Sequence, residues 1–218
     1  PDGRTKLSQP QLIGQILSDL WFDEKTESKP TPAPGGQVLE RELDAEPMND
    51  EFHYRSVIGK ANFLEKSTRP DIAVAVHQCA RFSSDPKQSH ADAVRYFGRY
   101  LQGTKDEGIY LDPNDDKSFE CWVDADFLGQ YIKGAEDMEL DAMTAKSRTG
   151  FIITYAGCPI TWASKVQRDA ALSSTESEYI AMSEAFRVLL PMMDLLEEAR
   201  KHDVPMRLGA PVVHCKAF

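Results

Sequence analysis

The chain has 218 residues, of which 41% are hydrophobic, and this is enough to bury the core of one or two domains. Its net charge of −10 argues against a protein that binds nucleic acid through a uniformly basic surface, because affinity for phosphate needs positive potential. The sequence shows neither an apolar run of the roughly 20 residues that cross a bilayer nor an N-terminal signal peptide, which predicts an intracellular protein without a membrane partner.

The first fifty residues divide into a helical part and a linker. Residues 1–22 are expected to form an N-terminal helical segment, because Leu12, Ile16 and Leu20 recur at the spacing of one helix face. Residues 23–50 are rich in proline, glycine and charge and contain little that could be buried, so we expect a linker there.

Residues 51–106 are expected to form a small helical region. Three apolar stripes at helical spacing occupy it, and Pro70 and Pro86 separate them. Pro70 fits the first turn of a helix, where the missing amide hydrogen would have no partner in any case. Gly103 is expected to end the third helix.

Residues 107–218 change to a mixed pattern, which predicts an α/β (α+β) fold with a mixed sheet and packing helices. Strands are expected at 108–111, 119–123, 151–155 and 160–163, and again from Val212. A long amphipathic helix is expected from residue 174, with a packed stripe that begins at Tyr179 and Met182.

The segment Asp124-Ala125-Asp126 follows the predicted strand 119–123. Alternate residues of a strand share a face, so Asp124 and Asp126 are expected to point the same way if the strand continues. Adjacent carboxylates repel each other unless a cation is bound, and their oxygen atoms suit Mg²⁺ or Mn²⁺ better than zinc. The sequence therefore indicates a metal site, and the alternative is a strand that ends in a solvated turn.

The start of the predicted helix carries two acids with different expected roles. Ser173 to Glu176 fits a capping box, which gives Glu176 a structural role. Glu178 lies about 200° around the helix from Glu176, so at most one of the two can join Asp124. We assign Asp124 and Glu178 to catalysis and to the metal, and expect Glu178 to face the strand. An ordinary exposed helix acid is the alternative.

Charge is segregated in this half of the chain. Residues 105–141 hold three Lys against twelve Asp and Glu, whereas residues 142–168 hold four basic residues and no acid. Loops on either side of the predicted hairpin are expected to bind phosphate groups beside the metal, and solubilising surface charge is the alternative. The predicted nucleic-acid contacts are Arg148, Thr149, Lys165 and Arg168.

Six segments carry recognisable motifs. They are YRSVIGKANFLEKSTRPDIAVAV (54–76), HADAVRYFGRYLQGTKDEGIYL (90–111), VDADF (123–127), SRTGF (147–151), CPITWASKVQ (158–167) and STESEYIAMS (174–183). In their residues and in their order along the chain, these segments resemble the polyproteins of copia-type LTR retrotransposons. The first two resemble the thumb- or connection-like region after the reverse transcriptase palm, and the last four resemble the ribonuclease H domain. Phe127 stands where the family usually has Trp, and the polymerase motif Tyr-x-Asp-Asp is absent.

The resemblance implies a polyprotein fragment with a ribonuclease H-like domain over residues 107–218, located in a cytoplasmic particle or the nucleus. By motif position, Asp124 and Glu178 match two metal carboxylates of the family. Two Mg²⁺ ions would then promote hydrolysis of the RNA strand of an RNA–DNA hybrid, which is the implied partner besides the rest of the polyprotein. The family's next Asp normally follows the strand that ends here at Phe218, so a truncated domain with weak or no activity is expected. The alternative is a non-catalytic relic that binds nucleic acid or protein as a scaffold.

Overall fold

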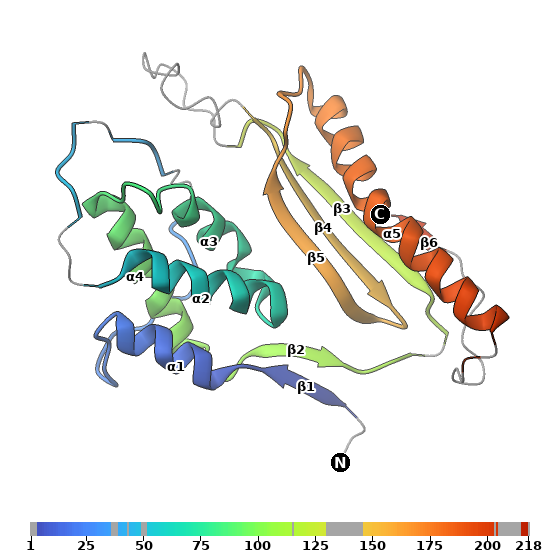
Figure 1. Ribbon diagram of the computed structural model, residues 1–218, viewed down its shortest axis with the longest axis horizontal. Coiled ribbons are helices and arrows are strands. Elements are labelled where there is room, and N and C mark those ends of the chain that lie inside the picture. The colour runs from blue at the N-terminus through green and yellow to red at the C-terminus, as the bar shows by residue number, and fades with distance from the viewer. Residues whose placement is uncertain are drawn as a thin grey trace. The chain divides into compact units, whose positions relative to one another are not determined.

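The computed structural model describes residues 4–35, 39–42, 44–48, 52–114, 116–129, 146–202, 204 and 215–217. The chain divides into two compact units (Figure 1). The helical unit is Leu7–Ile109, and the sheet unit is Pro1–Lys6 together with Tyr110–Phe218. The division at Tyr110 lies close to the boundary predicted after residue 106, and the mixture of helices and strands confirms the expected α+β class.

The helical unit is built on four α-helices and one 3₁₀ turn. They are α1 (Pro10–Asp19), α2 (Tyr54–Ser67), η1 (Pro70–Ile72), α3 (Ala73–Ala80) and α4 (Gln88–Gly103). Their apolar faces meet in one core, in which Ile16, Val57 and Phe97 are fully buried. Pro70 opens the 3₁₀ turn and Gly103 is the last residue of α4, as the sequence predicts.

Most described residues of the predicted linker 23–50 are exposed, but two of its residues, Leu39 and Met48, are buried in the helical core. The Leu39 amide donates to Gln78 Oε1 at 3.0 Å, and the Met48 amide donates to the Pro86 carbonyl at 3.0 Å. Two isolated apolar residues give no periodic signal, which is why the sequence pattern missed this packing.

A buried arginine links two of the motifs in this unit. Arg69 is 1% exposed, and its guanidinium donates to both carboxylate oxygens of Asp71 at 2.8 to 3.2 Å. It also donates to the carbonyl and hydroxyl oxygens of Thr104, which caps the end of α4, at 2.9 and 2.8 Å. The Tyr100 hydroxyl donates to Asp71 at 2.8 Å. These motif residues therefore hold the helices together.

His90 has a structural role as well. It is 1% exposed, and its Nδ1 accepts from the Lys87 amide at 3.0 Å. Its Nε2 lies 2.8 Å from the Glu40 carbonyl oxygen, which can only accept, so the ring proton is on Nε2. The ring stacks on Phe82 with a centroid distance of 3.8 Å. His90 thus fixes the start of α4.

Two carboxylates should make the stability of the helical unit sensitive to acid. Burial raises the pKa of Asp71, but hydrogen bonds and charge from Arg69 outweigh burial and hold this pKa below its ordinary value. The same balance, with His77 and Lys66 as partners, lowers the pKa of Glu65. A lowered folded-state pKa stabilises the protein above the unfolded-state pKa, and this stability is lost as the pH falls through the folded-state pKa.

We therefore expect the thermal midpoint of the helical unit to fall as the pH drops below about 4. Circular dichroism melts between about pH 3 and pH 7 would measure this effect. Asp71→Asn removes one of the two titrating groups and should make the acid slope shallower. An acid slope as steep in Asp71→Asn as in the unmodified chain would contradict the assignment to Asp71.

The sheet unit contains a four-stranded mixed sheet. Its strands are β3 (Phe119–Asp126), β4 (Arg148–Tyr155), β5 (Cys158–Val166) and β6 (Cys215–Ala217), in the order β5-β4-β3-β6. β3 is antiparallel to β4 and parallel to β6, and β4 is antiparallel to β5. The predicted hairpin turn at Ala156-Gly157 is confirmed, whereas the predicted strand start at Val212 lies outside the described residues.

The predicted strand at 108–111 is β2 (Gly108–Leu111), and it pairs with β1 (Thr5–Ser8). Residues 1–22 were expected to be helical throughout, so β1 is a correction to that expectation. Strand β1 has only four residues, which is too short to show the alternation of polar and apolar residues that marks a strand.

Helix α5 (Ser174–Lys201) lies along one face of the sheet (Figure 1). Its buried residues recur every four positions and are Ser177, Ala181, Ala185 and Leu189. Tyr179 and Met182 are 68% and 39% exposed, so the predicted stripe is wrong in its first two members. Small side chains bring the helix close to the sheet, and a pattern read from large apolar residues does not detect them. Pro191 lies inside α5 and does not end it.

Candidate metal and nucleic-acid site

Four elements meet at one edge of the sheet. Because β3, β4 and β5 are successively antiparallel, β3 and β5 end where β4 begins. Helix α5 starts at the same edge, since Gln167, which directly follows β5, is hydrogen-bonded to Ser177 in the first turns of the helix. This edge, which we call the acidic edge, carries every residue that the sequence assigned to a site.

Strand β3 continues through Asp126, which confirms that Asp124 and Asp126 share a face. That face is the one turned away from α5. Cys121 and the partly buried Val123 pack in the core that contains α5, whereas Trp122, between them, is 49% exposed. Asp124 and Asp126 are exposed with Trp122. Asp124 therefore points away from α5, because α5 covers the odd-numbered side of the strand.

Asp124 stands beside an open position in the sheet. Its partner across β4 is Gly150, and the next residue in the row is Ser164 of β5. A Cβ atom added at Gly150 would meet nothing closer than the backbone oxygen of Asp124, 3.9 Å away. Among the described residues, Gly150 therefore places no side chain between Asp124 and Ser164, and Arg148 Nη1 donates to the Ser164 hydroxyl at 3.4 Å on this face.

Asp126 lies over the turn that follows β3. A Cβ atom added at Gly129 would overlap the Asp126 carboxylate, so this carboxylate packs directly on the glycine. Leu128, between them, has a φ of 52°, in the region that disfavours side chains. Asp126 therefore contributes to the turn.

Three predicted metal carboxylates do not gather in one cluster. Among the residues that the structure describes, no group of three or more His, Cys, Asp or Glu side chains could hold a metal ion. The set Asp124, Asp126 and Glu178 is thus corrected, because Asp126 folds over its turn and Asp124 lies on the face away from α5.

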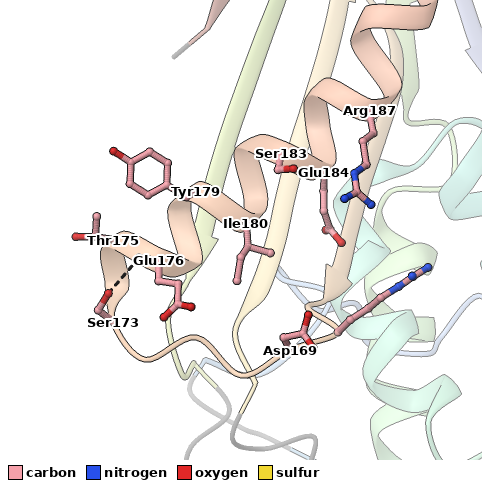
Figure 2. A pocket seen from close by; sticks show the side chains of 10 residues that line it. Asp169, Ser173, Thr175, Glu176, Tyr179, Ile180, Ser183, Glu184 and Arg187 are labelled. Atoms are coloured by element: carbon pink, nitrogen blue, oxygen red, sulfur yellow. Dashed lines mark hydrogen bonds between the residues drawn. The ribbon is translucent and has the colours of Figure 1, made fainter.

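The two acids at the start of α5 separate as predicted. Ser173 is the N-cap, and its Oγ accepts from the Glu176 amide at 3.1 Å (Figure 2). Glu176 Oε2 in turn accepts from the Leu172 amide at 2.7 Å, so its capping role is confirmed. Glu178 is exposed and lies in the first turns of α5, about two turns before Ala185.

The predicted phosphate contacts were placed in loops, and this is wrong for three of the four. Arg148 and Thr149 begin β4 and are buried, and Thr149 has no exposed surface for a phosphate group. Lys165 is in β5, and its Nζ lies 3.4 Å from Glu184 of α5. Arg168 follows β5 and is exposed, as predicted. The strands extend further toward the acidic edge than their apolar residues indicated.

A groove of about 510 Å³ runs beside the first turns of α5 (Figure 2). Arg168 and Arg187 line it, together with the hydroxyl-bearing Ser173 and Thr175 and the exposed ring of Tyr179. It does not include the carboxylates proposed for the metal. The carboxylates of Asp169, Glu176 and Glu184 line it as well, so its charge is mixed.

Sequence reasoning missed Gln167, which is 1% exposed. Its amide Nε2 donates to Thr149 Oγ1 at 3.2 Å and to the Ser177 carbonyl at 2.9 Å. A polar residue after a strand gives no periodic signal, and only its place in the motif CPITWASKVQ could have drawn attention to it.

No helix among the described residues is both long and apolar enough to cross a membrane. No protein-family model matches the chain, and no solved structure is significantly similar to it.

Curated relatives identify the family. The chain is 32% identical over 203 residues to the retrovirus-related Pol polyprotein from transposon TNT 1-94 of Nicotiana tabacum, covering 90% of this chain. It is 31% identical over 169 residues to the corresponding polyprotein from transposon RE1 of Arabidopsis thaliana, covering 77% of this chain. It spans only 14% and 10% of the lengths of these two relatives. An uncharacterized mitochondrial protein of Arabidopsis thaliana, AtMg00810, is 30% identical over 178 residues, which are 81% of this chain and 68% of that protein. The chain belongs to the retrovirus-related Pol polyproteins of copia-type transposons.

Proposed function

We propose that the sheet unit is the ribonuclease H-like domain of a retrotransposon polyprotein, which binds an RNA–DNA hybrid and hydrolyses its RNA strand with Mg²⁺ or Mn²⁺. One observation carries the proposal: Asp124 on a central strand and Glu178 in the first turns of α5 belong to the same edge of a mixed sheet. These are the two residues whose motifs match metal carboxylates of the family.

The donor atoms at the acidic edge fit the proposed ion. Mg²⁺ keeps several waters and is commonly held by one or two carboxylates together with substrate phosphates. Asp124 is exposed and Gly150 places no side chain beside it, so it can bind such a hydrated ion. When bound, the metal would supply an activated water and charge stabilisation at the leaving oxygen. Glu178 would be the second protein carboxylate available to the ion.

The neighbouring basic residues would hold the duplex. Arg168 is exposed after β5, and with Arg187 it lines the groove beside α5. Arginine binds phosphate oxygens through two parallel hydrogen bonds, which positions a backbone without reading its sequence. The Tyr179 ring at the rim of the groove offers a surface on which a base or sugar can pack.

The test is cleavage of an RNA–DNA hybrid, labelled on the RNA strand, by the full chain in Mg²⁺ and in EDTA, with fluorescence anisotropy to measure binding. We expect weak Mg²⁺-dependent cleavage of the RNA strand, in keeping with the truncated domain, and no cleavage of single-stranded RNA or of DNA duplex. The second candidate is a non-catalytic scaffold, which is favoured by the absence of a three-ligand group among the described residues. Hybrid binding without cleavage would overturn the enzymatic proposal in favour of the scaffold. Absence of both would overturn the enzymatic proposal and a scaffold that binds the hybrid.

A further inference from the structure

We infer that Gln167 is a positioning residue, whose buried amide fixes the first turns of α5 on the sheet and so sets the place of Glu178 relative to Asp124. The inference rests on the proposed function for its catalytic consequence, although the attachment itself is a property of the fold. It adds to the two carboxylates a residue that touches neither substrate nor metal.

The contacts of Gln167 join three elements. Its backbone amide donates to the Ser147 carbonyl at 2.8 Å, which closes the open end of the β4–β5 hairpin. Its side-chain Nε2 donates to Thr149 of β4 at 3.2 Å and to the carbonyl of Ser177 in α5 at 2.9 Å. Thr149 and Ser177 have no exposed surface, so water does not compete for these bonds.

The orientation of the amide follows from its partners. The Ser177 carbonyl can only accept a hydrogen bond, so the atom that faces it must be the amide nitrogen. The Gln167 Oε1 atom is buried and has no hydrogen-bond partner among the described residues. Both hydrogen bonds of the Gln167 side chain are therefore made through its amide nitrogen.

The two hydrogen-bond partners of the Gln167 side chain lie close to the two proposed carboxylates. Thr149 is paired across the sheet with Ala125, the residue directly after Asp124. Ser177 directly precedes Glu178, and its own Oγ donates to the Ser174 carbonyl at 2.6 Å. A single side chain thus spans from the strand neighbour of Asp124 to the helical neighbour of Glu178. Loss of its donor would let the start of α5 move relative to β3.

The experiment compares Gln167→Met with Ile153→Val in the full chain. Gln167→Met keeps the size of the side chain and removes the donor. Ile153 is fully buried in the same sheet and is paired with Cys121, away from the acidic edge. Ile153→Val removes one buried methyl group and so serves as a matched destabilising control. Hydrogen exchange along α5 and the Mg²⁺ concentration for half-maximal hybrid cleavage are measured for both variants.

We expect Gln167→Met to raise exchange at residues 176–184 with little change at residues 190–200. We also expect it to raise the half-maximal Mg²⁺ concentration roughly tenfold, the usual cost of losing a group that orients a metal ligand. Ile153→Val should neither raise exchange selectively at residues 176–184 nor raise the half-maximal Mg²⁺ concentration. Exchange that is unchanged, or that rises equally along α5, would overturn the inference. If the unmodified chain does not cleave the hybrid, the proposed function fails, and the exchange measurement still decides the role of Gln167.

Discussion

Replacement of Arg69 by methionine is expected to lower the free energy of unfolding by about 2 kcal/mol, because it removes the hydrogen bonds of a buried guanidinium to Thr104 and to the carboxylate of Asp71, which is 38% exposed. Methionine fills much of the space of the arginine stem but makes none of the bonds to Asp71 and Thr104. A loss of this size is a large part of the stability of an ordinary domain. Urea unfolding of the full chain, followed by circular dichroism, would measure it.

Arg55→Met is the matched control for this prediction. Arg55 is an exposed arginine of the same unit, and its Nε makes one hydrogen bond, at 2.7 Å, to the Ser83 carbonyl. We expect its loss to cost less than about 1 kcal/mol, as for other surface substitutions. Equal destabilisation by the two substitutions would show that burial of Arg69 and its pairing with Asp71 contribute nothing beyond an ordinary surface arginine.

Asp124→Asn is expected to reduce Mg²⁺-dependent cleavage of the hybrid at least 100-fold, whereas Asp126→Asn should stay within about threefold of the unmodified chain. A lost metal carboxylate removes several kcal/mol of charge stabilisation, and about 2.7 kcal/mol corresponds to 100-fold in rate. Asp126 packs on Gly129 in the turn, and asparagine keeps its shape there. Initial rates on the labelled hybrid, with binding measured separately, would distinguish the two variants.

The two acids of α5 supply a second matched pair. Glu178→Gln should lower the cleavage rate as Asp124→Asn does, because both carboxylates are proposed to hold the same metal. Glu176→Gln should leave the rate almost unchanged, since Glu176 accepts a hydrogen bond from the Leu172 amide and an amide oxygen can replace that acceptor. A large loss of rate in Asp126→Asn or Glu176→Gln, with Asp124→Asn or Glu178→Gln unaffected, would reverse the assignment.

Local chemistry predicted much of the architecture. Pro70, Gly103 and the Ala156-Gly157 turn were placed correctly, because each acts through its own backbone. The capping role of Glu176 was likewise visible in four consecutive residues. These features need no knowledge of what the rest of the chain does.

Features that depend on long-range packing were missed. The sheet-facing side of α5 is built on Ala181 and Ala185, which carry little hydrophobic signal although they are fully buried. The shared face of Asp124 and Asp126 was predicted, but which side α5 would cover was not, because alternation alone does not identify the side that a helix packs on. Burial of Thr149 depends on Gln167 and on the helix above it.

The hydrogen bonds of Arg69 bear on what happens when related genomic sequences accumulate substitutions. Each unit has its own hydrophobic core, and neither Arg69 nor Thr104 lies in the unit that contains the proposed carboxylates. A copy that acquires substitutions at Asp124 and Glu178 keeps every bond of Arg69. The Thr-Arg-Pro-Asp motif therefore serves folding, and its presence in a related sequence does not show whether the proposed carboxylates are also present.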